Sequence, residues 1–249
     1  MRFSTSFHAL LSECFPPEEI APFLGGSDLD RRTPKHRLFS GHYSVHTAER
    51  HFSDCAWLTF LREPISRAIS QYRSWHDPKN LTPYWIARID PEERRAVELA
   101  QSLTFEEYLE IDNEYIRASI SNYQCRLLCS FPAEVTTAVC SVSGSNLSEK
   151  VLESAKRNLI GQFGFFGLTE HFADSLYLFN SQFDTAVFDA NRRCRLNASE
   201  VVQPELSLSA GMRLKQLNEL DLELYHTAKL EFTRRLKTTT PALASARSA

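Results

Sequence analysis

The sequence predicts an α/β fold, in which a central parallel sheet is flanked by helices. Short apolar runs of the kind that form strands occur near residues 38–41, 55–61 and 163–167, and segments with helical spacing separate them. Strands that alternate with helices usually form a parallel sheet, because the helices serve as crossover connections. At 249 residues the chain is long enough to bury a substantial core. We therefore expect a single domain over residues 1–237 and a disordered tail over 238–249.

Local patterns predict the individual elements. Thr104 and Glu107 have the spacing of a capping box, which starts a short helix. The aromatic content of the run 163–168 is typical of a strand that is buried on both faces. Residues 16–37 and 76–101 contain prolines and polar residues typical of variable loops, the second with some helix. Further helices are expected over 92–100, 114–128, 148–159, 169–188 and, as a pair, 206–236.

Composition and charge exclude several classes of protein. The chain is 43% hydrophobic and 24% charged, and its net charge of −3 gives no global indication of nucleic-acid binding. No apolar run approaches the roughly 18 residues that span a bilayer, and the N-terminus lacks the pattern of a signal peptide. The six cysteines are scattered, without metal-site spacing, which favours a reducing compartment. We expect a cytoplasmic protein without a metal, although an upstream anchor would not be visible here.

The stretch 55–75 combines a buried strand with a helix. Residues 55–61 are apolar, Pro64 suits the first turn of a helix, and apolar residues then recur at helical spacing. Arg62 is therefore expected at the carboxyl end of the strand, and Ser70 two turns into the helix. Ligands of open α/β sheets collect at this end of the strands, where an arginine beside helix N–H groups can bind a phosphate. A structural salt bridge is an equally good interpretation of Arg62 from this pattern alone.

The segment FLREPISRAIS within this stretch closely resembles the 3′-phosphate-binding segment of sulfotransferases, especially the heparan-sulfate 2-O-sulfotransferase-like family. Three further segments are similar to segments of that family: NYQCRLL, FGFFGLTEHFADSLYLF and NELDLELYHTAKLEF. The resemblance covers about Thr5 to Leu236 and implies the P-loop-like sulfotransferase fold. It also implies that Arg62 and Ser70 hold the 3′-phosphate of 3′-phosphoadenosine 5′-phosphosulfate (PAPS), the co-substrate of these enzymes.

The N-terminal segment allows two interpretations. Its apolar residues have helical spacing, so Ser4, Thr5 or Ser6 could cap an amphipathic helix. The resemblance implies instead that Ser4, Thr5 and Ser6, followed by Phe7, end a P-loop-like turn that holds the 5′-phosphosulfate. The position of the family's lysine falls on Met1, and the strand that precedes the turn is absent. Under the resemblance, the first strand is missing or truncated, or the loop is degenerate.

The resemblance also indicates a catalytic base. His42 follows Gly41 at the end of an apolar run, where relatives of the 2-O type carry a Gly-His segment whose histidine is the proposed base. A packing role is the alternative for His42. His46 and His51 lie in a polar stretch and are expected at the surface. If His42 is not the base, Glu49 is the next candidate.

Two other segments with arginine leave a functional and a structural interpretation open. Residues 191–195 form the densest basic cluster, which is either a solvated face or part of a loop that closes over PAPS in sulfotransferases. In the second case Arg193 and Arg195 would bind the nucleotide or the acceptor, because arginine can clamp phosphate. In NYQCRLL, the resemblance brings Arg126 near the cofactor or the acceptor, whereas a core-packed helix would leave it solvated.

The resemblance implies transfer of a sulfuryl group from PAPS to a hydroxyl of an acceptor, which we expect to be a carbohydrate. A neutral His42 would accept the hydroxyl proton, and no metal is required. The competing hypothesis is a catalytically impaired relative that binds PAPS, its bisphosphate product or a sulfated glycan, because the loop lysine is missing. A P-loop kinase is disfavoured, since no GxxxxGKS or GxxxxGKT motif occurs. The acceptor and the oligomeric state stay open.

Overall fold

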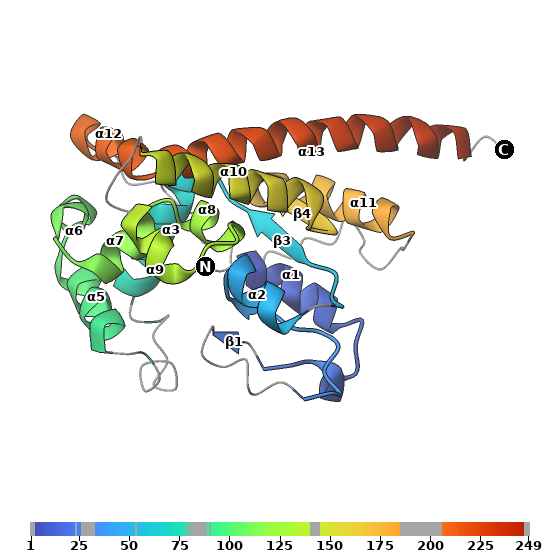
Figure 1. Cartoon of the computed structure of the whole chain (residues 1–249), viewed down its shortest axis with the longest axis horizontal. Helices are drawn as coiled ribbons and strands as arrows, with labels where there is room; N and C mark the ends of the chain where they lie inside the picture. Colours follow the sequence, from blue (N-terminus) through green and yellow to red (C-terminus); the bar gives the residue numbers. More distant parts are fainter. Residues whose placement is uncertain are drawn as a thin grey trace.

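The computed structural model of the chain describes residues 3–22, 24–25, 33–52, 54–77, 79, 89, 91–139, 145–184 and 206–246. It is a mixed α/β structure in which short parallel strands lie among many helices (Figure 1). The long helix α13 (Glu219–Ala246) extends along most of the longest axis, and α10 (Asn146–Gly161) packs beside it. The structure therefore confirms the predicted α/β class, because it contains both helices and parallel strands.

Two short parallel sheets take the place of the single central sheet that the sequence predicts. Strand β1 (Leu24–Gly25) pairs with β2 (Gly41–His42), and an isolated bridge joins Ile20 to Leu38. Strand β3 (Leu58–Leu61) pairs with β4 (Phe165–Leu168) over four residues. The two sheets do not pair with each other within the described ranges. The described strands thus form two separate pairs and not one continuous sheet.

Strands β3 and β4 form the centre of the main apolar core. All four residues of β4 are buried, which confirms the prediction of a strand covered on both faces. Gly167 in β4 faces the ring of Phe60 so closely that an added Cβ would lie 2.5 Å from a ring carbon. A glycine is therefore needed there for the ring to pack against the strand.

The helices near the strands begin at positions that the sequence explains. Helix α3 (Pro64–His76) starts with proline, as predicted, and the Glu63 side chain accepts hydrogen bonds from Ile65 N and Ser66 N. Helix α2 (Val45–His51) is capped by Ser44. Helix α1 (Phe3–Ser12) includes residues 4–6, so the backbone of this segment is helical rather than a separate loop. The 3-10 turn η1 spans Pro17–Glu19.

The predicted helix over 114–128 is in fact two helices, α7 (Glu114–Ile120) and α8 (Tyr123–Leu128). They are separated at Asn122, whose φ of 43° is left-handed and cannot continue a helix. The Asn122 side chain stabilises this break, because its Oδ1 accepts hydrogen bonds from Leu220 N at 3.0 Å and from Asp221 N at 3.3 Å. The helical break therefore depends on a contact with α13.

The other helices agree with the sequence except near their ends. Ser145, not Ser148, caps α10, and Thr169 begins a 3-10 turn, η4 (Thr169–His171), instead of capping a helix. The capping box of Thr104 and Glu107 is present as predicted. Helix α13 continues beyond Leu236 into the stretch 238–246, where the sequence predicts a tail. The remaining helices are α5 (Pro91–Ser102), α6 (Phe105–Glu110), α9 (Ala133–Val139), α11 (Phe172–Gln182) and α12 (Leu208–Leu217).

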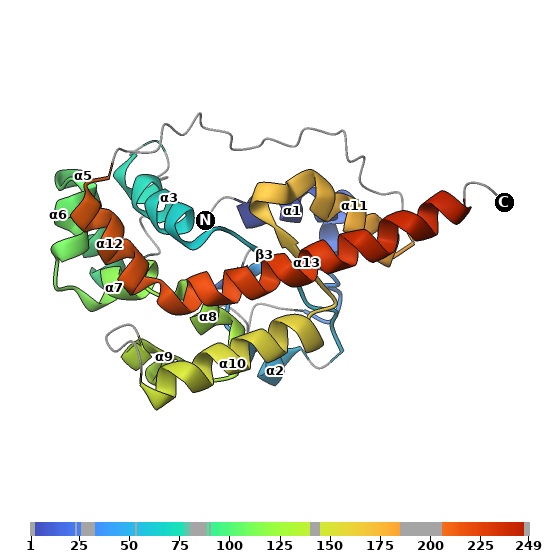
Figure 2. The same ribbon diagram turned by 90° about the horizontal axis from the view of Figure 1, so that it is seen from above.

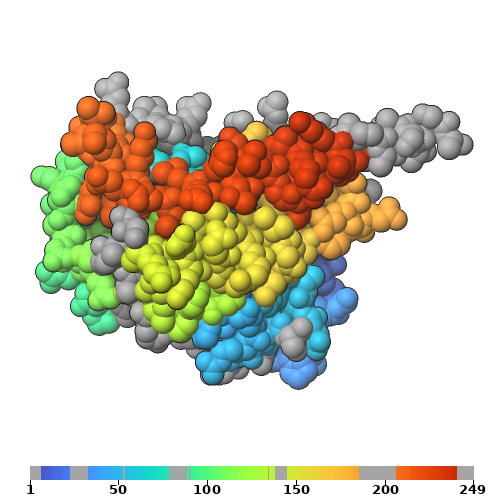
Figure 3. All heavy atoms as spheres, turned by 45° about the horizontal axis from the view of Figure 1, so that its top comes forward, coloured from blue at the N-terminus to red at the C-terminus, as the bar shows by residue number. Residues whose placement is uncertain are grey.

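Buried apolar residues form two large clusters on either side of the β3–α3 connection. One cluster joins β3 and β4 to α1, α8, α10, α11 and α13. The other joins α3 to α5, α6, α7 and α12 (Figure 2). The space-filling view shows α13 and α10 side by side on the surface of the molecule (Figure 3). Residue 62 therefore lies where the two parts of the core meet.

Among the described cysteines, Cys14, Cys125 and Cys129 form no disulfide. Of the helices that the structure describes, none is both long and apolar enough to cross a lipid bilayer. The single domain over 1–237 and the cytoplasmic location stay predictions.

Candidate functional site

A pocket of about 510 Å³ lies between β2 and β3 and reaches the first turns of α3. Helices α1 and α8 contribute further walls, through residues such as Phe7 and Gln124. Polar residues of the lining include His8, His42, Arg62, Arg67, Ser70 and Gln124. Three residues that the sequence analysis selected independently of any geometry, His42, Arg62 and Ser70, thus line one pocket.

Arg62 is held at the carboxyl end of β3 through both of its backbone groups. Its N–H donates to Gln124 Oε1 at 2.9 Å, and Gln124 Nε2 donates to the Arg62 carbonyl at 2.8 Å. The Gln124 carboxamide therefore pairs with Arg62 as a neighbouring strand would. Burial lowers the pKa of the half-buried Arg62 guanidinium, while Glu170 and Glu63 oppose this change. Arginine stays charged at neutral pH in such surroundings.

The loop between β3 and α3 has a second support. Glu63 N donates to Glu170 Oε1 at 2.9 Å, and the Tyr225 hydroxyl donates to Glu170 Oε2 at 2.6 Å. The Glu63 carboxylate itself accepts from the first N–H groups of α3. These N–H groups are therefore occupied, which corrects the expectation that they assist Arg62 in binding an anion. If α3 assists Arg62 in binding an anion, the hydrogen-bond donors come from its side chains and not from these N–H groups.

Gln124 is fixed by a buried carboxylate of α13. Asp221, which is fully buried, accepts hydrogen bonds from Gln124 N at 2.9 Å and from Cys125 N at 2.7 Å. Burial raises the pKa of the Asp221 carboxyl, and Arg67 together with these N–H groups opposes the increase. A chain of contacts therefore runs from α13 through α8 to Arg62, and sequence analysis missed both Gln124 and Asp221.

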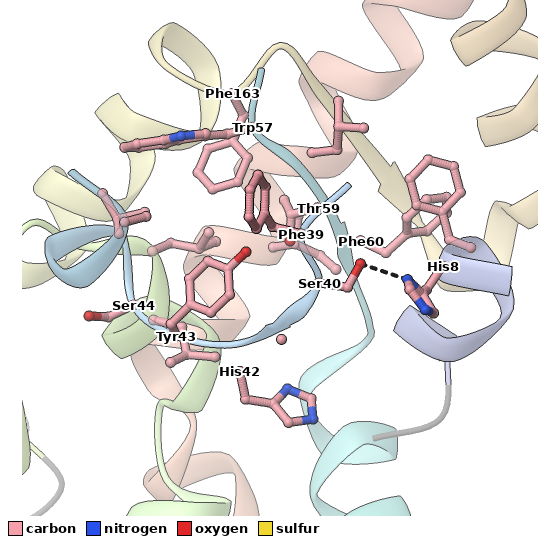
Figure 4. Close-up of a pocket in the computed structure, with 18 of the residues that line it drawn as sticks. His8, Phe39, Ser40, His42, Tyr43, Ser44, Trp57, Thr59, Phe60 and Phe163 are labelled. Atoms are coloured by element: carbon pink, nitrogen blue, oxygen red, sulfur yellow. Dashed lines mark hydrogen bonds between the residues drawn. The ribbon is translucent and has the colours of Figure 1, made fainter. Parts of the chain in front are cut away.

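His42 is the second residue of β2 and faces the pocket (Figure 4). Burial lowers its pKa to about 4, so the imidazole is neutral at pH 7. A neutral imidazole has a nitrogen that can accept a proton from a hydroxyl. His42 thus has the protonation state that a general base requires, although its low basicity would have to rise when an anionic substrate binds nearby.

A second histidine lines the pocket and was missed in the sequence. His8 Nδ1 lies 2.7 Å from Ser40 Oγ, across 32 residues of chain (Figure 4). Burial also lowers the pKa of His8. In the sequence, His8 occupies an ordinary position of the predicted N-terminal helix. No motif or spacing relates it to Ser40, so its contact could not be predicted.

The other candidate bases lie outside the pocket. His46 Nδ1 is 3.2 Å from the Ser130 carbonyl oxygen, and Glu49 Oε1 accepts from Ser130 Oγ at 2.8 Å. Neither residue lines the pocket, and neither does His51. His8 therefore replaces Glu49 as the alternative to His42.

Aromatic rings form a large part of the pocket wall (Figure 4). Trp57 and Phe163 lie with their ring centroids 5.9 Å apart, and Phe52 contacts the rings of Phe39 and Tyr43. The lining thus combines aromatic rings with the cationic residues Arg62 and Arg67. Sites for organic ligands commonly combine apolar walls with a few polar groups in this way.

Several predicted site residues are not tested by this geometry. Arg193 and Arg195 lie outside the described residues, as do the side chains of Ser4, Thr5 and Ser6.

Arg126 lies in the described part of the chain, but it does not line the pocket. Its Nη1 instead donates to the carbonyl of Ala118. The structure therefore favours a packing role for Arg126 over a contact with the ligand, and the residue is half-buried rather than solvated.

An arginine at the carboxyl end of a parallel strand and a neutral histidine thus line one pocket, a combination that suits the binding of an anion and the acceptance of a proton. The chain is 29% identical over 190 residues to human heparan-sulfate 6-O-sulfotransferase 1, covering 72% of this chain and 44% of that protein. It is 31% identical over 192 residues to human heparan-sulfate 6-O-sulfotransferase 2, covering 72% of this chain and 30% of the relative. The chicken (Gallus gallus) heparan-sulfate 6-O-sulfotransferase 2 is 28% identical over 188 residues, again over 72% and 44%.

These similarities support a carbohydrate sulfotransferase family for this chain. The 2-O branch that the sequence resemblance indicated is not supported, because these relatives carry the 6-O name. The chain spans less than half the length of each of them. No family model matches the chain.

The low pKa of His42 predicts a pH effect that does not require activity. Because the native state disfavours the imidazolium, an unfolded chain binds this proton more readily, and stability should fall as the pH drops from about 6.5 towards about 4. A ring-proton NMR titration, assigned with His42→Gln, should give a midpoint near 4 for His42. A midpoint near 6.5 would contradict the burial of this side chain.

Proposed function

We propose that this chain is a PAPS-dependent sulfotransferase that transfers a sulfuryl group to a hydroxyl of a carbohydrate. The observation that carries the proposal is that His42, Arg62 and Ser70 line one pocket in a chain related to heparan-sulfate sulfotransferases. The proposal includes the P-loop-like sulfotransferase fold, with the 5′-phosphosulfate near Ser4, Thr5 and Ser6. Arg193 and Arg195 stay candidates for further contacts with the nucleotide.

Arg62 and Ser70 would bind the 3′-phosphate of the nucleotide. Arg62 offers a positive charge on a backbone that Gln124 holds in place, so little backbone freedom is lost on binding. Ser70 lies on the face of α3 that lines the same pocket. A pocket of about 510 Å³ falls within the usual range for organic ligands of this size.

His42 would act as the general base. The acceptor hydroxyl oxygen forms a bond to sulfur while the bond between sulfur and the 5′-phosphate oxygen breaks, and the hydroxyl proton moves to the His42 imidazole. The products are a sulfated carbohydrate and adenosine 3′,5′-bisphosphate. The negative charges of the nucleotide would raise the pKa of His42 above its value in the empty pocket and so favour proton uptake.

The names of the relatives support heparan sulfate as the acceptor class and a 6-hydroxyl as the acceptor group. We therefore propose that the acceptor is a heparan-type glycan that lacks 6-O-sulfate.

Binding of adenosine 3′,5′-bisphosphate tests the proposal, with AMP as the comparison because it lacks the 3′-phosphate. We expect calorimetry to show tighter binding of the bisphosphate, and we expect Arg62→Ala to weaken it at least tenfold, since a charged hydrogen bond contributes about 1.5–3 kcal/mol. Binding of AMP should change little. The control is Arg73→Ala, which removes an arginine of α3 that does not line the pocket. Equal affinity of the wild-type protein for the two nucleotides would refute the nucleotide assignment.

A further inference from the structure

The guanidinium of Arg67 is buried, and only some of its N–H groups have hydrogen-bond partners. The residue lies in α3 and is 7% exposed. Its Nη1 donates to the Ser119 carbonyl at 2.8 Å, and its guanidinium lies over the Tyr123 ring, 4.9 Å from the centroid. Its Nε and Nη2 atoms are buried and have no hydrogen-bond partner within the described part of the chain. Unpaired charged donors of this kind are costly, so their retention calls for an explanation.

The carboxylate that opposes the charge of Arg67 is that of Asp221, and its oxygens already accept other hydrogen bonds. The Asp221 carboxylate raises the pKa of Arg67, against the larger effect of burial, which lowers it. Both oxygens of Asp221 accept hydrogen bonds from backbone N–H groups of α8, and no ion pair joins Asp221 to Arg67 among the described contacts. Asp221 therefore compensates the charge of Arg67 from a distance without saturating its donors.

The position of Arg67 relates its donors to the anion site. Arg67 and Ser70 are three residues apart, which places them on one face of α3, and both line the pocket. The charge of Arg62 lowers the pKa of Arg67, as expected for two cations at close quarters. Two guanidinium groups beside a hydroxyl suit a phosphate dianion, which offers several acceptor oxygens to fork-shaped donors.

We propose that Arg67 is a second phosphate-binding arginine, whose Nε and Nη2 bind the same 3′-phosphate as Arg62 and Ser70. This inference rests on the proposed function, because it names a further ligand-binding residue of that site. The first N–H groups of α3 donate to Glu63 and are not available to an anion. The positive charge of Arg67, one turn further along α3, would take their place. Because Nε and Nη2 have almost no accessible surface in the empty pocket, the Arg67 side chain must turn towards the phosphate for the missing hydrogen bonds to form.

The chain offers a close control in Arg126. This arginine also donates through Nη1 to a carbonyl of α7, that of Ala118, and its Nε is also buried without a partner. Unlike Arg67, it does not line the pocket. A substitution of Arg126 therefore removes a similar structural contact and a positive charge that acts on Arg67, but it removes no residue of the pocket lining.

The test compares Arg67→Met and Arg126→Met with the wild-type protein. Calorimetry with adenosine 3′,5′-bisphosphate should show at least tenfold weaker binding for Arg67→Met, with AMP affinity nearly unchanged. Arg126→Met should bind both nucleotides like the wild type. The melting temperature without ligand should fall for both variants, because each loses a hydrogen bond to a carbonyl of α7 and Arg67→Met also removes the charge opposite Asp221. The ratio of the two nucleotide affinities is therefore the result that distinguishes a phosphate contact from a structural role.

Two results for Arg67→Met would overturn the inference. Wild-type affinity for the bisphosphate would leave Arg67 a structural residue, and an equal loss of AMP and bisphosphate affinity would place it away from the 3′-phosphate. If Arg67→Met does not fold, Arg67→Lys is the test, because it keeps the charge but loses the fork-shaped donors. Arg67→Lys should bind the bisphosphate more weakly than the wild type, and unchanged affinity refutes the inference. Failure of the wild-type protein to prefer the bisphosphate is a different result, because it removes the proposed function itself.

Discussion

Replacement of His42 by alanine is expected to lower the turnover of sulfuryl transfer by about 10²–10⁴-fold, the usual contribution of a general base. Affinity for adenosine 3′,5′-bisphosphate should stay nearly unchanged, because a base acts in the transition state and not in nucleotide binding. The side chain lines the pocket and is neutral at pH 7. Turnover is measured as transfer of labelled sulfate from PAPS to heparan sulfate whose 6-O-sulfates have been removed, and affinity is measured separately by calorimetry.

His46→Ala and His8→Ala are the controls for this experiment. His46 lies outside the pocket, so its loss should leave turnover unchanged. His8 lines the pocket and contacts Ser40, so a large loss of turnover in His8→Ala with normal turnover in His42→Ala would identify His8 as the base. Loss of nucleotide binding in His42→Ala would indicate that His42 has a structural role instead.

The strand and helix around Arg62 could be predicted because their signals are local. The apolar run before Arg62, Pro64 at the first helical position and the periodic apolar residues after it are all readable within 20 residues of chain. The same holds for the capping box at Thr104. The assignment of Arg62 and Ser70 to a phosphate came from a resemblance, and the geometry adds only that both line one pocket with His42.

The supports of the site could not be predicted, because they join residues that lie far apart in the chain. Gln124 pairs with the backbone of Arg62 across 62 residues, and Asp221 pairs with Gln124 across 97. A glutamine that hydrogen-bonds a distant backbone has no periodic or spacing signal in a single sequence. Asn122 shows the same limitation, since its left-handed conformation ends α7 only because α13 supplies N–H groups to its side chain.

Asp221 should be the residue whose loss damages the protein most. Its carboxylate is fully buried and is the acceptor for two backbone N–H groups of α8, those of Gln124 and Cys125. Asp221→Ala leaves both N–H groups buried without an acceptor and removes the charge opposite Arg67. We expect the free energy of unfolding to fall by about 3–5 kcal/mol, measured by urea denaturation followed by circular dichroism.

Two comparisons separate this effect from a general loss of charge on α13. Glu223→Ala removes an exposed carboxylate that pairs with Lys156 at 2.7 Å, and it should cost less than about 1 kcal/mol. Asp221→Asn keeps one acceptor oxygen for α8, so it should lie between the wild type and Asp221→Ala in stability. Because Asp221 fixes Gln124, and Gln124 fixes Arg62, folded Asp221→Asn should also bind adenosine 3′,5′-bisphosphate more weakly than the wild type does. If Asp221→Asn binds the bisphosphate with wild-type affinity, Asp221 stabilises the fold without positioning Arg62. If the free energy of unfolding of Asp221→Ala falls by less than about 1 kcal/mol, Asp221 does not have the predicted stabilising role.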